Sequence, residues 1–258
     1  MTKDEVRRRL EFYRDLGVRT VYRRDAQAAE GGLQAAGSEL QEAGGRKREA
    51  ETAPTPAVLP VVLSLSPAHD NLSKISEDIG DCKRCRLHEG RNRIVFGSGN
   101  EQAKLVFVGE GPGADEDEQG LPFVGRAGQL LTQMIDGTAR KEGIPIQRSD
   151  VYICNVVKCR PPGNRTPQPD EMEICGQFLF RQLQTIRPKA ICAMGSTAAK
   201  ALLGTKEGVM RLRGKWHQWR DLPVMVTYHP SYLLRPYNQD AKKEAWEDLK
   251  KVLHFVYD

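Results

Sequence analysis

The sequence lacks any apolar run that approaches the roughly 18 residues a membrane-spanning helix needs. No apolar signal-peptide core follows Met1, so we expect a cytoplasmic protein with no membrane partner. A strong excess of one charge sign is also missing. The 39 Lys and Arg residues against 34 Asp and Glu residues leave a formal net charge of +5, which permits nucleic-acid binding without requiring it.

Internal repeats are absent, and so is any Ser-His-Asp or Cys-His pattern typical of a nucleophilic enzyme. Cysteine is scarce, with six residues in 258. In a chain expected in the cytoplasm, so few cysteines indicate a metal site or buried thiols more than a disulfide framework.

The first 70 residues lack a core-forming pattern. Residues 3–17 carry apolar side chains at helical spacing and predict one short amphipathic helix. From residue 25 to about residue 70 the chain is rich in Ala, Gly, Glu and Gln and then in Pro, which is typical of a flexible linker. We therefore divide the chain into an extension over residues 1–70 and a folded domain over residues 71–258.

The folded part alternates apolar strands with helices. The strands are expected at Lys104–Glu110, Val151–Val157, Ala190–Met194 and Val224–Tyr228. The helices are expected at Gly125–Glu142, Asp170–Ile186, Ser196–Leu203 and Asp240–Val256. This order predicts an α/β fold, a three-layer α/β/α sandwich whose central parallel sheet has four strands.

The first of these strands ends in a glycine-rich loop, Gly109-Glu-Gly-Pro-Gly113. Its spacing fits the dinucleotide fingerprint, which needs a helix whose first N–H groups are free to bind a pyrophosphate. Four carboxylates follow instead, in Asp115–Glu118, and they would repel phosphate. We expect this loop to bind a neutral group, or one that develops positive charge.

A polar side chain also follows three of the four strands. Glu110 ends the first strand, Asn155 and Asn164 follow the second, and His229 follows the fourth. In open α/β sheets the ligand site lies beyond the carboxyl ends of the strands, so these side chains should meet in one crevice.

Two of the cysteines form a Cys82-x-x-Cys85 pair, which has the spacing of metal ligands. Cys159 and Cys175 could complete a four-cysteine site that joins the segment before the sheet to its second crossover. Such a site suits either zinc or an iron–sulfur cluster. Cys154 and Cys192 lie within predicted strands and read as buried core residues.

These motifs together resemble those of the family 4 uracil-DNA glycosylases, the iron–sulfur members of their superfamily. The resemblance rests on Cys82-x-x-Cys85, Gly109–Gly113, Leu121-Pro-Phe-Val-Gly125, the stretch Asn155–Pro167 and His229-Pro-Ser-Tyr-Leu-Leu234, in the family's order. It covers the chain from about Leu72 onward. It implies hydrolysis of the N-glycosidic bond of deoxyuridine in single- or double-stranded DNA, and a [4Fe–4S] cluster bound by Cys82, Cys85, Cys159 and Cys175.

The resemblance also implies roles for the crevice residues. Glu110 would stabilise positive charge on the sugar, Asn164 would position water, and His229 would donate to uracil O2. Phe123 would stack on the base, Asn155 would pair with its edge, and Glu116 would exclude thymine. The Gly111 and Pro112 backbone would approach the base. The DNA-binding residues would be Leu233, Leu234 and Arg235.

Two alternatives remain. A related superfamily member binds uracil-DNA covalently without turnover, but it carries a longer, histidine-containing loop where Lys158–Pro167 has none. The other alternative is a non-catalytic DNA-binding module stabilised by a metal. Such a module could bind a replication or repair partner through the N-terminal helix. We expect a monomer.

Overall fold

The computed structural model describes residues 70–258. The helix expected over residues 3–17 and the linker expected after it lie outside the described residues. Within residues 70–258, no helix is both long and apolar enough to cross a membrane.

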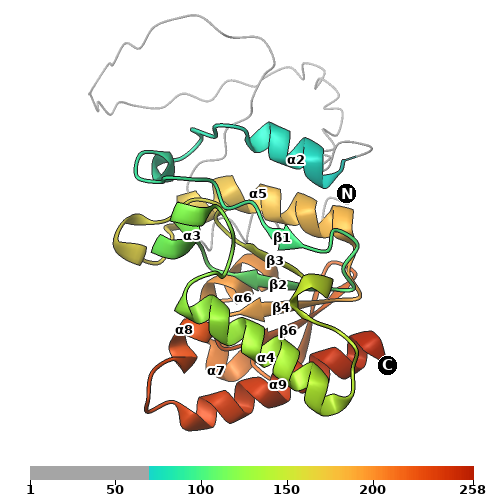
Figure 1. Cartoon of the computed structure of the whole chain (residues 1–258). Helices are drawn as coiled ribbons and strands as arrows, with labels where there is room; N and C mark the ends of the chain where they lie inside the picture. Colours follow the sequence, from blue (N-terminus) through green and yellow to red (C-terminus); the bar gives the residue numbers. More distant parts are fainter. Residues whose placement is uncertain (1–69) are drawn as a thin grey trace, which may run out of the picture.

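The described chain forms a sheet with helices on both faces (Figure 1). The strands are β1 (Ser98–Gly99), β2 (Leu105–Gly109), β3 (Tyr152–Asn155), β4 (Ala190–Met194), β5 (Trp216–Trp219) and β6 (Leu222–Thr227). The α-helices are α2 (Leu72–Ile79), α3 (Ala114–Gln119), α4 (Arg126–Glu142), α5 (Pro169–Ile186), α6 (Ser196–Leu203), α7 (Val209–Leu212), α8 (Pro230–Leu233) and α9 (Gln239–Tyr257). Short 3-10 turns lie at Arg86–His88, Arg148–Asp150 and Pro162–Asn164.

The sheet has the strand order β1-β3-β2-β4-β6-β5. Strands β3, β2, β4 and β6 are parallel, so the predicted four-stranded parallel core is confirmed. The expected strand total was too low, because β1 and β5 add an antiparallel strand at each edge. Strand β1 is two residues long and carries no apolar run, so periodicity could not reveal it.

Side chains along the inner strands alternate between two hydrophobic layers. Val106 and Val108 pack on one face with residues of α2, α5 and α6, whereas Leu105 and Phe107 pack on the other face with residues of α4 and α9. Figure 1 shows α2 and α5 on one side of the sheet and α4 and α9 on the other. The three-layer sandwich is therefore present.

The helix boundaries follow local sequence signals. Helix α5 starts with Pro169, whose missing N–H costs nothing at that position, and Glu171 caps its first turn. Helix α4 ends at Gly143, which adopts the left-handed conformation that glycine tolerates. These signals place both predicted helices within one residue of their observed ends.

Helix α3 departs from our expectation for the glycine-rich loop. A helix does open at Ala114, directly after Gly113, as the dinucleotide fingerprint requires. The Glu116 carboxylate accepts a hydrogen bond from the Gly113 N–H at 3.1 Å, so an internal anion already occupies this helix start. Our expectation that no such helix follows the loop is therefore wrong, and the start of the helix is capped by its own Glu116.

Candidate active site

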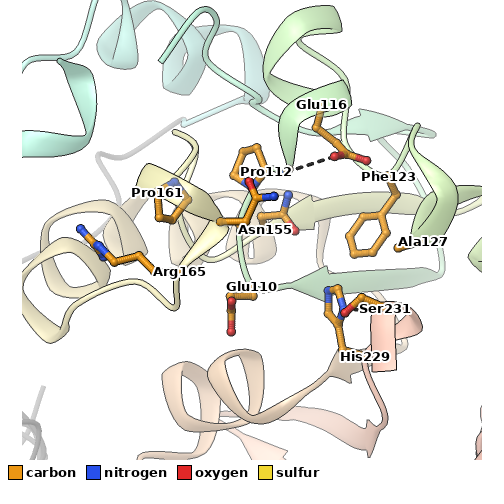
Figure 2. Close-up of a pocket in the computed structure, with 13 residues that line it drawn as sticks. Glu110, Pro112, Glu116, Phe123, Ala127, Asn155, Pro161, Arg165, His229 and Ser231 are labelled. Carbon is orange, nitrogen blue, oxygen red and sulfur yellow. Dashed lines mark hydrogen bonds between the residues drawn. The ribbon is translucent and has the colours of Figure 1, made fainter. Parts of the chain in front are cut away.

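The carboxyl ends of the parallel strands surround a cavity of about 200 Å³. It is lined by Glu110, Gly111, Pro112, Gly113, Glu116, Phe123, Ala127, Asn155, Pro161, Asn164, Arg165, His229 and Ser231. The four polar residues predicted to meet at the strand ends all line this one space, which confirms the predicted crevice. Figure 2 shows the side chains of Glu110, Asn155 and His229 projecting from separate elements.

Asn155 ends β3 and is buried, with 1% of its surface exposed. Within the described part of the chain, neither its amide nitrogen nor its amide oxygen has a hydrogen-bond partner. A buried, unpaired amide costs on the order of 1–3 kcal/mol for each polar group. Such a cost is retained where a ligand supplies the missing partners, and an amide offers one acceptor and two donors to it.

Two rings form one wall of the cavity. The Phe123 and His229 ring centroids lie 5.6 Å apart with the planes tilted by 38°, and Figure 2 shows the rings next to each other. Phe123 is buried and has a φ of 55°, which a bulky residue adopts at a cost in strain. A planar, aromatic or heteroaromatic ligand fits beside such a wall.

His229 presents a neutral hydrogen-bond donor to the cavity. Its Nδ1 accepts the backbone N–H of Ser231 at 3.2 Å and lies 2.8 Å from Ser231 Oγ. With Nδ1 acting as an acceptor, the neutral ring carries its proton on Nε2. Removal from water lowers the pKa of His229 to about 4, so the ring is uncharged at neutral pH.

The Glu110 side chain is positioned by a residue that the sequence did not single out. The Thr197 hydroxyl, buried in the first turn of α6, donates a hydrogen bond to Glu110 Oε2. The start of a helix also favours a negative charge. Thr197 is one of many threonines by sequence, and only the fold brings it across 87 residues to Glu110.

The Phe123 loop is held from two sides. Glu116 Oε1 accepts hydrogen bonds from the Val124 and Gly125 N–H groups, both at 2.9 Å, while its other oxygen binds Gly113. Arg148 donates to the Pro122 carbonyl at 2.8 Å from the other side. Sequence reasoning missed Arg148, because a lone arginine before a strand carries no signal of its contacts.

Asp117, in the acidic run after the glycine-rich loop, does not line the cavity. It is buried and accepts hydrogen bonds from the Asn92 N–H at 2.9 Å and the Asn92 side-chain amide at 2.8 Å. Asp117 therefore ties α3 to the segment before β1. Among the acidic residues between positions 110 and 118, Glu110 and Glu116 line the cavity.

Asn164 reaches the cavity from an exposed turn. It has a φ of 55°, a conformation that asparagine tolerates better than most residues. Its side-chain oxygen accepts a hydrogen bond from Arg160 Nε at 2.7 Å. The next residue, Arg165, pairs with both oxygens of the buried Glu171 at 2.8 and 2.6 Å, which anchors the turn to α5.

The four predicted cysteine ligands line a second, apolar cavity. Cationic or amide groups point at three of the sulfurs: Arg84 at Cys82 (3.4 Å), Arg91 at Cys159 (3.4 Å) and the Lys158 N–H at Cys175 (3.2 Å). Burial raises the pKa of the Cys85, Cys159 and Cys175 thiols. Among the described residues, no three His, Cys, Asp or Glu side chains stand at the spacing of a single metal ion.

Donors directed at the sulfurs favour the thiolate form, which is the form in which cysteine binds metals. Cys154 and Cys192 are fully buried within β3 and β4, as expected for core residues.

Lys158 connects the two cavities. Its side chain is buried, and Nζ donates to the Asn155 carbonyl at 2.8 Å and to Gln182 Oε1 at 2.6 Å. Its backbone N–H points at Cys175. Burial lowers the pKa of this lysine. The end of β3 and the cysteine cavity are thus built on the same turn of chain.

One of the three residues expected to bind DNA, Leu233, is buried instead of exposed. Leu233 is 1% exposed and packs in the core with residues of α4 and α9, so it cannot reach a ligand on the surface. Leu233 ends helix α8, which is too short to be predicted from the sequence and which turns the Leu233 side chain inward. Leu234 is half-buried and Arg235 is exposed, so these two remain available.

Comparison with known proteins places the chain in a family. Residues 96–250 match the model of the uracil DNA glycosylase superfamily. A type-4 uracil-DNA glycosylase of Thermotoga maritima is 46% identical over 70% of this chain and 93% of its own length. The chain belongs to the type-4 uracil-DNA glycosylases.

Other relatives agree with this assignment. A type-4 uracil-DNA glycosylase of Archaeoglobus fulgidus is 42% identical over 71% of this chain and 92% of its own length. A type-5 uracil-DNA glycosylase of Pyrobaculum aerophilum is 29% identical over 60% of this chain and 71% of its own length. The family resemblance drawn from the motifs is confirmed.

The lowered pKa of His229 makes a prediction about this type-4 glycosylase. Because the folded state favours the neutral ring, protonation favours the unfolded chain, and His229 lowers the free energy of unfolding as pH falls from about 6.5 to about 4. In urea unfolding at pH 7 and pH 5, the His229→Gln variant should therefore lose less stability on acidification than the wild type.

His254 provides the matched control with the opposite sign. Its pKa is raised by hydrogen bonds to Glu142 and Asp258, so its stabilising contribution is present at acid pH and is lost as pH rises through the folded pKa. His254→Gln should lose more stability than the wild type between pH 7 and pH 5. Equal slopes for the two variants would contradict the neutral assignment of His229.

The Glu116 contacts generate a second prediction. In the wild type, backbone N–H groups donate to both oxygens of Glu116. In Glu116→Gln, the amide nitrogen replaces one of these acceptors and faces another donor, so the free energy of unfolding should fall by about 1–3 kcal/mol. Urea unfolding at pH 7 measures this loss. Glu118→Gln, an exposed position on the same helix, should change stability by less than about 0.5 kcal/mol. Similar losses in both variants would show that the Glu116 contacts contribute nothing specific.

Proposed function

We propose that this protein hydrolyses the N-glycosidic bond of deoxyuridine in DNA, releasing uracil and leaving an abasic site. The buried, unpaired Asn155 amide beside the Phe123 and His229 rings is the observation that carries this proposal. An amide with both polar atoms free matches the adjacent acceptor and donor of a uracil edge, O4 and N3–H. The names of the relatives, uracil-DNA glycosylases, support the same activity.

The substrate base is flipped out of the DNA into the cavity before the reaction. Phe123 stacks on the ring, and the Asn155 amide pairs with its O4 and N3–H. The backbone of Gly111 and Pro112 closes the cavity against the base. Cytosine presents the reverse arrangement at this edge, so in the amide orientation that suits uracil it would leave both Asn155 and its own polar groups unpaired, which disfavours its binding.

Cleavage of the bond separates charge, positive on the sugar and negative on the departing base. The Glu110 carboxylate, oriented by Thr197, stabilises the oxocarbenium-like sugar. His229 donates its Nε2 proton in a hydrogen bond to uracil O2 as negative charge develops there. Asn164 positions the water that adds to the sugar carbon, its amide fixed by Arg160.

Glu116 serves the choice between uracil and thymine. Its three backbone hydrogen bonds fix the carboxylate at the cavity wall. We propose that this rigid wall leaves no space for the C5 methyl group of thymine. Leu234 fills the gap that the flipped base leaves in a duplex, and Arg235 contacts the backbone.

Cys82, Cys85, Cys159 and Cys175 hold a [4Fe–4S] cluster in this proposal. The ring of four sulfurs around one apolar cavity supports it, as do the donors directed at three of them. A bound cluster supplies a covalent cross-link between the segment before β1 and the turn that follows β3. The residues of the base cavity carry out the reaction.

A uracil-release assay on short oligonucleotides tests the proposed chemistry. Asn155→Asp should weaken uracil release and admit cytosine, because a carboxylate can accept from the cytosine amino group. His229→Ala should lower the single-turnover rate about 10²–10³-fold with little change in the affinity for uracil-DNA, because its hydrogen bond strengthens in the transition state. Loss of selectivity in His229→Ala instead of Asn155→Asp would contradict these roles.

The cysteine assignment predicts a coloured protein with iron and sulfide in equal amounts. Cys159→Ser and Cys175→Ala should each lose the colour, since three thiolates hold the cluster poorly. Cys154→Ala and Cys192→Ala are the controls, because these cysteines are also buried but lie within strands, and both variants should keep the colour. A colourless wild type with one zinc per chain would reject the cluster.

A further inference from the structure

The segment that follows His229 exposes aromatic side chains. Tyr237 is 75% exposed, the highest value among the large apolar side chains of residues 70–258, and Tyr232 is 37% exposed. Exposing a large ring to water forgoes the free energy of burying it, so an exposed aromatic pair marks a surface for a ligand with apolar faces. Both tyrosines lie within eight residues of His229, whose ring lines the base cavity.

The backbone of this segment is fixed, although its side chains are exposed. Asn238 is buried, donates from its side chain to the Tyr232 carbonyl at 2.7 Å, and donates its N–H to the Arg235 carbonyl at 3.1 Å. The Tyr232 ring stacks on Tyr228 with the centroids 5.3 Å apart. The turn therefore presents its exposed side chains on a rigid support.

Arg235 lies between the two exposed tyrosines. Its guanidinium carbon is 5.7 Å from the centre of the Tyr232 ring, and its Nη1 is 3.5 Å from the Tyr237 hydroxyl. Two flat aromatic rings with a cation between them match the repeating chemistry of a single nucleic-acid strand, in which flat bases alternate with phosphates.

We propose that Tyr237 forms a stacking platform for a base next to the flipped uridine on the same DNA strand, with Tyr232 supporting Arg235, which contacts the intervening phosphate. The platform follows the base cavity directly along the chain, because Ser231 lines the cavity and Tyr232 is the next residue. The inference rests on the proposed release of uracil. It adds a second base-binding position that is indifferent to sequence, since every base has a π-face.

The occupant is nucleic acid more readily than protein. A stable protein interface needs about 800 Å² from each partner, far more than two tyrosines offer. One stacked base, by contrast, covers a single ring.

The test uses single-stranded oligonucleotides with 2-aminopurine next to uracil. Wild-type protein should quench the 2-aminopurine fluorescence on binding, and Tyr237→Ala should reduce the quenching and raise the Kd and KM about tenfold. The single-turnover rate at saturating DNA should stay unchanged, because the platform does not touch the reacting atoms. Tyr237→Phe, which keeps the ring, should restore quenching and affinity.

Two controls separate stacking from other effects. Phe255→Ala removes another exposed aromatic, at the end of α9, and should leave the Kd and quenching at wild-type values. Arg235→Gln should reduce the salt dependence of binding by about one phosphate contact, whereas Tyr237→Ala should leave that dependence unchanged.

The platform is rejected if Tyr237→Ala binds and quenches like Phe255→Ala, or if Tyr237→Phe fails to restore binding. A wild type that binds and quenches but releases no uracil would overturn the proposed function and leave the platform standing. Loss of the platform with normal uracil release gives the opposite result, so the two failures are distinguishable.

Discussion

The base cavity depends on the absence of a side chain at the end of β2. A Cβ atom at Gly109 would lie 2.4 Å from the Asn155 side-chain oxygen and 2.5 Å from the Phe123 ring. Both groups therefore pack directly against the Gly109 backbone, which brings the Asn155 amide and the Phe123 ring to the same place. Any larger residue would separate them. The glycine-rich loop thus serves close approach within the protein, before any ligand is bound.

The acidic residues that follow this glycine make different contacts. Glu110 is oriented by Thr197 and borders the cavity. Glu116 neutralises the start of α3 and fixes the Phe123 loop. Asp117 binds the segment before β1. The fold therefore gives these three carboxylates different surroundings, with Glu110 and Glu116 at the cavity and Asp117 away from it.

Strand and helix positions were predictable because burial imposes a period on them, and the strand-end residues were predictable because parallel strands share one edge. Contacts that depend on long-range packing were not. Thr197 and Arg148 have no local signal, and β1 is too short to show one. Leu233 was misjudged because the two leucines of this motif look alike in sequence, while the turn of α8 buries one and leaves the other at the surface.

The turn after β3 joins the cavity lined by the four cysteines to the cavity lined by Asn155. Lys158 binds the Asn155 carbonyl with its side chain and Cys175 with its backbone N–H, while Cys159 follows directly. No hydrogen bond to another group orients the Asn155 side-chain amide. The position of this amide therefore depends on how the backbone of Asn155 is held. A group that links the cysteines would immobilise this turn, and through Lys158 it would hold the amide ready for the base. In the proposed function, this short stretch of chain would couple the stability of the cysteine site to recognition of the base.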